Sequence, residues 1–383
     1  MPIPLDEYPI HQTPLSLQFP ASSDRNFYDR CYINAHDKTG EIFLITGFGI
    51  YPNLGVVDAY ACVRIGDTQH AVQFSDALTD DRMNQKVGPY RIEVIEPLQT
   101  LRVVCEADDL GIGFDLTWTG AFPAVQEQPH LWRTGNKAIL DACRFAQTGN
   151  WAGELRVDGT TYEVTPDVWC GTRDRSWGIR PVGEPEPAGR GAAETAPDWG
   201  FWWTYIPMQF DDYAVVIIAQ EDGQGHRTLN DAVRVWPEDS ERVKAGRNNV
   251  ELLGWPRFDY HYTSGTRVPT GVTITCHGDD GEPFVIEVDS KGYVVLAQGC
   301  GYGSDPSWGH GQWKGREWSQ RVDVDMTDPG VVAMATFGVI DHVGHAVATE
   351  ADGSSQEGWG LFEHATFGAH SPSGFTDFGS VAP

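Results

Sequence analysis

The sequence predicts an all-β protein built as two antiparallel β-barrels. Its 383 residues include 43 glycines and 24 prolines, a share that favours short strands and turns over long helices. Residues 112–118 alternate apolar and polar side chains, which is the period-2 pattern of a strand with one buried face. The Asp-Gly pairs at 158–159 and 222–223 suit tight hairpins, and a meander of hairpins removes its exposed edges by closing into a barrel.

The predicted strands follow one another along both halves of the chain, each as a short segment between turn residues. In the first half they cover residues 42–48, 90–95, 101–105, 112–118, 154–157 and 161–164. In the second half they cover residues 201–206, 214–219, 232–235, 258–262, 271–276, 284–288, 293–297, 321–325, 331–339 and 358–363. The best helix candidate is residues 137–147, because Ile139, Cys143 and Ala146 fall on one helical stripe.

A segment rich in proline and glycine divides the chain nearly in half. Residues 181–197 have no apolar periodicity and are typical of a linker or a long exposed loop. We therefore predict an N-terminal barrel domain at residues 1–183, a linker at residues 184–197 and a C-terminal barrel domain at residues 198–383.

Charge and composition argue against several classes of partner. The 54 acidic residues outnumber the 27 basic ones and give a net charge of −27, which disfavours nucleic acid and anionic membrane surfaces. No run of about 18 uncharged apolar residues is present, so no membrane insertion is expected. The cysteines form no C-x-x-C pair and their number is odd, which favours buried thiols over zinc or a disulfide framework.

The same features predict a cytoplasmic protein that needs no metal and no cofactor. The N-terminal segment lacks a basic start followed by an apolar run, so it does not resemble a secretory signal. The segment at residues 47–49, G-F-G, lacks the third glycine and the following helix of a dinucleotide-binding fingerprint.

The densest group of chemistry-bearing residues lies at residues 169–180, with three arginines, one aspartate and two tryptophans. Asp174 stands between Arg173 and Arg175, which can hold its carboxylate ionised in a structural ion-pair network. Alternatively, Asp174 is desolvated against Trp177 and donates a proton, while the arginines fix its geometry. Spacing alone leaves both interpretations open.

Two further stretches supply aromatic and acidic side chains. Residues 199–205 include Trp202, Trp203 and Tyr205, which form either the π-rich wall of a pocket or plain barrel core. On the last predicted strand, Glu363 shares a face with apolar neighbours and either serves as an acid or base or pairs with an arginine.

Weaker signals complete the set of candidates. Tyr51 and Asp115 are candidate polar groups of a pocket in the first barrel. Residues 341–345, D-H-V-G-H, contain two imidazoles, but on a strand His342 and His345 would point to opposite faces, and no further ligand cluster follows. This pattern favours a hairpin turn over a metal site.

The run D-R-S-W-G at residues 174–178, ahead of the aromatic run at 199–205, resembles the D-H-N-W-G segment and following aromatic strand of carotenoid 1,2-hydratases. Those enzymes belong to a wider group of tandem lipocalin-like proteins that also includes kievitone hydratase-like enzymes and some fungal intramolecular Diels-Alder cyclases. Residues 47–55, 171–180 and 200–212 are similar to an uncharacterised bacterial subgroup of this superfamily, and that resemblance covers most of the chain.

The resemblance implies two lipocalin-like antiparallel β-barrels in tandem, with an apolar ligand held in or between them. Asp174 and Trp177 match the hydratase motif, whereas Arg175 stands where that motif has histidine. A guanidinium cannot donate a proton near neutral pH as an imidazole can. Asp174 would therefore carry the acid role alone, or the reaction differs.

Three functions fit this combination of residues and resemblance. The first is a cofactor-independent hydratase or dehydratase, a carbon–oxygen lyase that acts on a hydrophobic terpenoid-like or aromatic-alkyl molecule by acid-initiated proton transfer. The alternatives are an isomerase or cyclase in the same pocket and a non-catalytic lipophile-binding protein. The expected catalytic residues are Asp174, Arg175, Trp177 and Glu363, and the expected substrate-binding residues are Arg173, Trp202, Trp203, Tyr205, Tyr51 and Asp115. A hydrophobic small molecule is the expected partner, and the oligomeric state is open, a homodimer included.

Overall fold

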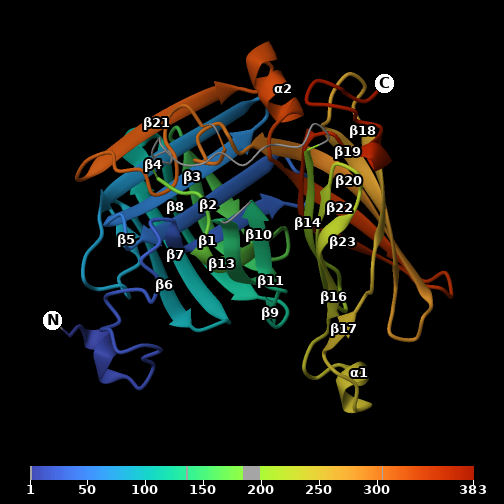
Figure 1. Cartoon of the computed structure of the whole chain (residues 1–383), viewed down its shortest axis with the longest axis horizontal. Coiled ribbons are helices and arrows are strands. Elements are labelled where there is room, and N and C mark those ends of the chain that lie inside the picture. The colour runs from blue at the N-terminus through green and yellow to red at the C-terminus, as the bar shows by residue number, and fades with distance from the viewer. Residues whose placement is uncertain (1, 135–136, 184–198, 304) are drawn as a thin grey trace.

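The computed structural model describes residues 2–134, 137–183, 199–303 and 305–383. Within them the chain forms two curled antiparallel sheets, each a half-barrel, that lie side by side (Figure 1). The predicted all-β class and the tandem barrel arrangement are confirmed. Among the helices of this part of the chain, none is both long and apolar enough to cross a membrane.

The first sheet has 14 strands. Its hydrogen-bonded order is β21-β4-β3-β2-β1-β13-β11-β8-β7-β6-β5, and β9, β10 and β12 pair with β11. The bounds are β1 (Phe27–Asp37), β2 (Ile42–Tyr51), β3 (Val56–Ile65), β4 (Thr68–Ala77), β5 (Lys86–Val87), β6 (Tyr90–Glu96), β7 (Thr100–Ala107), β8 (Ile112–Gly120), β9 (Val125–Gln126), β10 (His130–Thr134), β11 (Lys137–Val157), β12 (Thr160–Val164), β13 (Trp169–Ile179) and β21 (Trp318–Asp325).

The second sheet has nine strands in the order β17-β16-β15-β14-β23-β22-β20-β19-β18. The bounds are β14 (Gly200–Gln209), β15 (Ala214–Asp222), β16 (Arg227–Val235), β17 (Val250–Leu252), β18 (Arg257–Tyr262), β19 (Pro269–His277), β20 (Pro283–Val295), β22 (Ile340–Thr349) and β23 (Ser355–Gly368). The helices are short: α1 (Glu241–Lys244), α2 (Pro329–Thr336) and the 3₁₀ turns η1 (Pro4–Glu7), η2 (Asp108–Leu110) and η3 (Ser371–Ser373).

One strand crosses from the second half of the chain into the first sheet. β21 pairs with β4 at the edge of that sheet, with Trp318 opposite Ser75 and Asp325 opposite Thr68, and in Figure 1 it lies among the blue N-terminal strands. The predicted domain boundaries stay a prediction, and the predicted linker at 184–197 lies outside the described residues. Strand β21 therefore joins the second half of the chain to the sheet formed by the first half.

The predicted helix at residues 137–147 is wrong. This segment is the first half of β11, which pairs with β13 on one side and with β10 and β9 on the other. Ladder hydrogen bonds on both edges outweigh the modest helical preference of the segment, as tertiary context commonly does.

The predicted strand at 331–339 is also wrong, because helix α2 occupies most of it. The side chain of Asp328 caps this helix by accepting a hydrogen bond from Gly330 N at 2.7 Å, and Pro329 occupies the first turn. Every other predicted strand overlaps a strand of the structure.

The predicted hairpin turn at residues 341–345 is a third error. These residues lie inside strand β22, where Asp341 pairs with Glu363 of β23. Gly344 lies on a crowded strand, where an added Cβ would come 3.1 Å from Val288. Asp341 is thereby carried into the interior of the protein, where it is fully buried.

Alternation along the strands separates the three largest hydrophobic clusters of the described residues. One fills the curl of the first sheet, a second fills the curl of the second sheet, and the third lies between the sheets. On β1, Cys31 and Ile33 face the first core, whereas Tyr32 faces the core between the sheets. The side chains that meet between the sheets therefore come from segments far apart in the sequence.

Candidate functional site

A cavity of about 190 Å³ lies between the two sheets. Strands β1, β11 and β13 of the first sheet and β14 and β23 of the second supply most of its walls. Asp174 and Ser176 of β13 line it from one side, and Trp203 and Tyr205 of β14 line it from the other. An apolar cavity of about 150 Å³ can hold benzene, so this space admits a small organic molecule.

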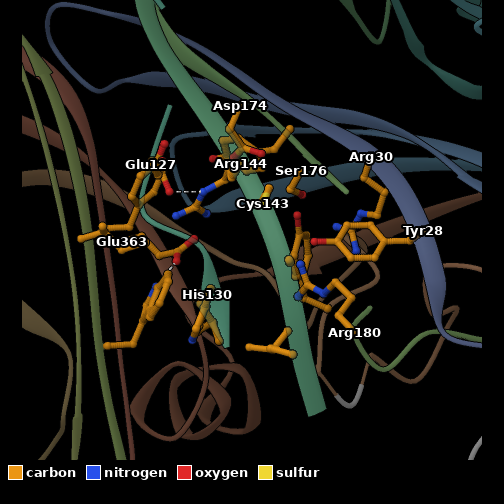
Figure 2. A pocket seen from close by; sticks show the side chains of 18 of the residues that line it. Tyr28, Arg30, Glu127, His130, Cys143, Arg144, Asp174, Ser176, Arg180 and Glu363 are labelled. Atoms are coloured by element: carbon orange, nitrogen blue, oxygen red, sulfur yellow. Dashed lines mark hydrogen bonds and ion pairs between the residues drawn. The ribbon is translucent and has the colours of Figure 1, made fainter. Parts of the chain in front are cut away.

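Asp174 is the central acidic group of this cavity (Figure 2). β13 places it between Tyr32 of β1 and Ala146 of β11, and its side chain makes no hydrogen bond to any residue that the structure describes. Burial raises the pKa of Asp174 from 3.8 to about 7, while Arg144 opposes this shift and Glu127 adds to it. Asp174 is therefore a carboxylic acid that holds its proton part of the time at neutral pH.

The half-buried Arg144 and the buried Glu127 form an ion pair beside Asp174. Arg144 Nε donates to Glu127 Oε2 at 2.7 Å, and the guanidinium carbon lies 4.2 Å from the centre of the Tyr205 ring. Burial raises the pKa of Glu127, and Arg144 lowers it. The pair fixes Arg144 over the face of Tyr205 and holds a positive charge near the central carboxyl group.

A second acidic group orients the tryptophan of the wall. Trp203 Nε1 donates a hydrogen bond to Glu363, whose backbone lies opposite that of Asp341. The hydroxyl of Tyr32 donates to Asp341 Oδ2 at 2.6 Å. Burial and the neighbouring Glu363 carboxyl raise the pKa of Asp341 well above its usual range.

His130 stacks on the same tryptophan without adding charge. Its ring lies 5.7 Å from the Trp203 ring at an interplanar angle of 11°, and Nε2 lies 2.8 Å from Gln220 Oε1. Burial lowers the pKa of His130 to about 4, so the imidazole is neutral near pH 7. It supports the ring of Trp203 as a flat uncharged neighbour.

The opposite end of the cavity is basic. Figure 2 shows Arg30, Tyr28 and Arg180 together on one side and Glu127, Glu363 and His130 on the other. Gly49 leaves room for this end, because a Cβ there would come 2.8 Å from Cγ of Arg30. The cavity thus has an acidic end, a basic end and Asp174 between them.

Metal-ligating residues do not gather in the part of the chain that the structure describes. No group of three or more histidine, cysteine, aspartate or glutamate side chains there could hold a metal ion. In the cavity, Glu127 accepts from Arg144 and Glu363 accepts from Trp203 instead.

Comparison with known proteins assigns the chain to a family. Residues 3–376 match the model of a family of unknown function (DUF8625). The chain belongs to this family. No curated protein matches its sequence.

Solved structures share the fold of this DUF8625 protein. CghA superposes with a TM-score of 0.50 at 12% identity over 89% of this chain and 88% of that one. A Nitrosomonas europaea protein assigned as AttH gives 0.50 at 11% identity over 94% and 98%. Kievitone hydratase from Nectria haematococca gives 0.49 at 13% identity over 88% of each chain. The identities are low, so the likeness of CghA and of the Nitrosomonas europaea protein concerns the fold alone, and it agrees with the expected all-β arrangement of two sheets.

Four of the residues that the sequence indicated meet in the cavity of the DUF8625 protein: Asp174, Trp203, Tyr205 and Glu363. They come from β13, β14 and β23, so the two sheets must pack together to assemble them. Tyr205 differs from the expectation in one respect, because Arg144 covers its ring face.

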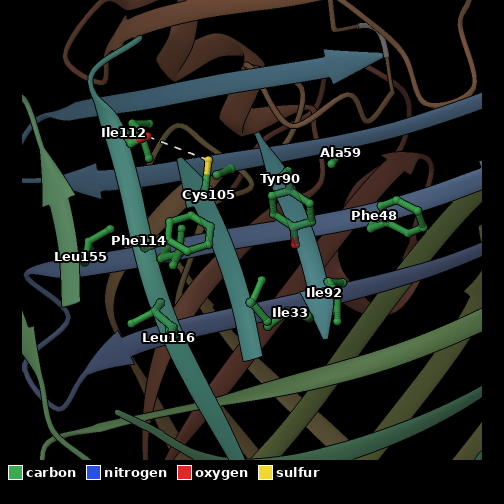
Figure 3. Packing of buried hydrophobic residues seen from close by; sticks show 14 of the residues in the cluster. Ile33, Phe48, Ala59, Tyr90, Ile92, Cys105, Ile112, Phe114, Leu116 and Leu155 are labelled. Atoms are coloured by element: carbon green, nitrogen blue, oxygen red, sulfur yellow. Dashed lines mark hydrogen bonds between the residues drawn. The ribbon is translucent and has the colours of Figure 1, made fainter. Parts of the chain in front are cut away.

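The structure does not bring the neighbours of Asp174 into this cavity. Arg173 and Arg175 point to the other face of β13, over the edge of the first core, whose packing Figure 3 shows. Arg173 bonds Gln147 Oε1 at 2.7 Å, and Arg175 pairs with Asp29 at 2.9 Å. Trp177 lies on the same face of β13 as Arg173 and Arg175, and it does not line the cavity.

The other three candidates lie elsewhere. Trp202 faces the inside of the second sheet and stacks on His370 at 5.4 Å. The hydroxyl of Tyr51 donates to Asp58 Oδ1 at 3.1 Å in a fully buried position behind the basic end. Asp115 is 46% exposed and accepts two hydrogen bonds from Arg102 on the outside of the first sheet.

Sequence reasoning missed several residues of the cavity, notably Arg30, Glu127, His130, Arg144 and Arg180. Arg144 fell within the segment assigned to a helix, where its side chain had no predicted direction. Arg180 belongs to the dense group at residues 169–180 but was not selected as a site residue. Arg30, Glu127 and His130 lie outside the groups that the sequence singled out.

Proposed function

We propose that the cavity between the sheets binds a hydrophobic terpenoid-like or aromatic-alkyl molecule and hydrates or dehydrates it without a cofactor. One observation carries this proposal: Asp174 faces the cavity as a desolvated carboxyl group whose pKa is raised to about 7. A general acid works best when its pKa lies near the working pH. Asp174 meets this requirement beside a wall of aromatic rings.

In this mechanism the Asp174 O–H bond breaks while a C–H bond forms on one carbon of a substrate alkene. The neighbouring carbon then carries positive charge, and the oxygen of a water molecule adds to it. The proton released by that water returns to the Asp174 carboxylate, so the enzyme is unchanged. Dehydration of a tertiary alcohol follows the same steps in reverse.

The aromatic wall supports the cationic state. Phe201 and Trp203 line the cavity, and a ring face stabilises a nearby cation by about 0.5–2 kcal/mol when water is excluded. Glu363 and His130 hold the Trp203 ring in one orientation from its edge and from one face. Because His130 is neutral, it does not repel the developing charge.

The experiment that tests the proposal begins with the lipophilic material that copurifies with the protein. This material is extracted, identified by mass spectrometry and incubated with fresh protein in water enriched in ¹⁸O. Reversible hydration predicts ¹⁸O in the alcohol and the appearance of the matching alkene. A stoichiometric ligand that is recovered unchanged would contradict the proposal and favour a carrier.

Replacing Trp203 with leucine is expected to lower turnover by about 10-fold, because a cation–π contribution of about 1–2 kcal/mol is lost. The rate of ¹⁸O exchange measures the effect. Trp255→Leu is the matched control, because Trp255 is 68% exposed and does not line the cavity. Equal rates of ¹⁸O exchange in the wild type and in Trp203→Leu would show that the Trp203 ring does not stabilise the cationic state.

Turnover is expected to fall as the pH rises through about 7, since the raised pKa of Asp174 sets the fraction of protein that carries the reacting proton. Above that pKa the rate should decline about 10-fold per pH unit, and below it the rate should level off. A pH–rate profile with saturating ligand provides the measurement. A rate that rises between pH 7 and 9 would assign the proton transfer to another group.

A further inference from the structure

Two arginines at the basic end of the cavity surround one tyrosine ring. The guanidinium carbons of Arg30 and Arg180 lie 5.0 Å and 5.9 Å from the centre of the Tyr302 ring, and that of Arg180 lies 5.7 Å from the Tyr28 ring. Arg30 is 6% exposed. Both side chains line the cavity, so two positive charges share this end.

Neither guanidinium has a hydrogen bond or an ion pair with the residues that the structure describes. Three other arginines of the same part of the chain, one half-buried and two buried, contrast with them. Arg144 pairs with Glu127, Arg234 pairs with an acidic side chain at 2.8 Å, and Arg267 donates to backbone carbonyl oxygens at 2.9 Å and 3.0 Å. The fold therefore supplies acceptors where an arginine is structural.

Asp58, an acidic residue whose charge acts on Arg30, is engaged elsewhere. Its Oδ1 accepts from the hydroxyl of Tyr51 at 3.1 Å, and its Oδ2 accepts from Gly311 N at 2.7 Å. No Asp58 oxygen lies within ion-pair distance of Arg30, and burial raises the pKa of Asp58 to about 7, so its charge is incomplete at neutral pH. The basic end therefore keeps a positive charge that no ion pair with the described residues neutralises.

An unpaired charge in a desolvated site is costly unless a partner arrives. The planar guanidinium presents several N–H donors in a fork that matches the two oxygens of a carboxylate. Tyr302 and Tyr28 hold the planes of these forks by their ring contacts, so little side-chain freedom is lost when an anion binds.

We propose that Arg30 and Arg180 form a subsite for a carboxylate group of the ligand. The apolar frame of that ligand then extends from the subsite along the aromatic wall, with Asp174 beside its carbon skeleton. This inference rests on the proposed function only for the reaction at Asp174, and it narrows the substrate class to amphipathic molecules with an acidic head and an apolar body.

The test compares two ligands of nearly the same shape that differ in charge. Binding of cinnamate and of cinnamamide to the full chain is measured by isothermal titration calorimetry near pH 7. Cinnamate is expected to bind with one-to-one stoichiometry and about 10-fold or more tightly than the amide, because only the acid offers an anion to the arginines.

Arg180→Gln tests whether this subsite produces the preference. The half-buried position of Arg180 tolerates the change more readily than the buried position of Arg30. We expect Arg180→Gln to lose about 10-fold in cinnamate affinity and to bind cinnamamide as the wild type does. Arg133→Gln is the matched control, since Arg133 is exposed and lies outside the cavity, and it should keep the full preference.

Three results would overturn the subsite: equal affinity for acid and amide, no saturable cinnamate binding up to about 10 mM, or an unchanged preference in Arg180→Gln. These outcomes are separate from the fate of the proposed reaction. If cinnamate binds more tightly than cinnamamide while ¹⁸O exchange is absent, the carboxylate subsite is supported and the hydration mechanism is contradicted.

Discussion

In an Asp174→Asn variant we expect turnover to fall by about 10²–10⁴-fold, the contribution typical of a positioned general acid. Asparagine keeps the size and shape of the side chain, so the cavity and its aromatic wall are retained, but an amide cannot deliver the proton that starts the reaction. The rate of ¹⁸O exchange into the extracted ligand provides the measurement. Ligand affinity, measured by calorimetry, should change little.

The control for this variant is Asp109→Asn, which removes one acidic group from an exposed position that does not line the cavity. It should turn over the ligand at the wild-type rate, so that the loss in Asp174→Asn cannot be assigned to the change in net charge. Full turnover in Asp174→Asn would remove Asp174 from the mechanism and leave an isomerase, a cyclase or a carrier to explain the cavity.

The Asp174→Asn substitution is also expected to stabilise the protein at alkaline pH. Burial raises the pKa of Asp174 from 3.8 to about 7 in the folded state, so the folded protein binds this proton more tightly than the unfolded chain does. The free energy of unfolding therefore falls as the pH rises from about 4 to about 7. The shift corresponds to a cost of up to about 4 kcal/mol above pH 7, and asparagine avoids it. Urea denaturation of both proteins at pH 8 measures the difference.

A residue whose replacement abolishes turnover and raises stability is retained for function. If Asp174→Asn were instead less stable at pH 8, the carboxylate would be held by favourable contacts. The structural ion-pair interpretation that the sequence left open would then be correct.

The sequence predicted the strands better than the helices, for a reason visible at residues 137–147. Ile139, Cys143 and Ala146 fit a helical stripe, yet the same segment also alternates well enough to form a strand. Pairing with β13 on one edge and with β10 and β9 on the other decides between the two, and those partners lie outside any local window. Conversely, the apolar residues 331–336 form a helix because Asp328 caps them.

The site shows the same limit at the scale of single residues. Asp174, Arg175 and Trp177 stand together in the sequence and were expected to act together, but strand alternation turns odd-numbered and even-numbered residues of β13 to opposite faces. Had the run 169–179 been recognised as a strand, Arg175 and Trp177 would have been separated from Asp174. Arg30 and Glu127 could not have been found, because only the closing of the two sheets brings them to the cavity.

Replacing Arg144 with methionine is expected to lower the free energy of unfolding by about 3–5 kcal/mol at pH 8, because it leaves the Glu127 carboxylate buried without its counter-ion. Glu127 is 4% exposed, and Arg144 Nε lies 2.7 Å from its Oε2. Urea denaturation followed by circular dichroism measures the loss. Arg156→Met is the matched control, since Arg156 pairs with Asp108 at the same 2.7 Å on the surface, where such a pair contributes about 0–1 kcal/mol.

The pH dependence of this loss identifies its cause. Burial raises the pKa of Glu127 and Arg144 opposes the shift, so in Arg144→Met the pKa rises further. A carboxyl group whose pKa is raised by folding favours the folded state as the pH falls, so the deficit should shrink between pH 8 and pH 5. Glu127→Gln combined with Arg144→Met should likewise recover most of the stability, because no charge is left unpaired. A deficit that is equal at both pH values and persists in the double variant would mean that the lost packing of Arg144 over Tyr205, and not the stranded carboxylate, destabilises the protein.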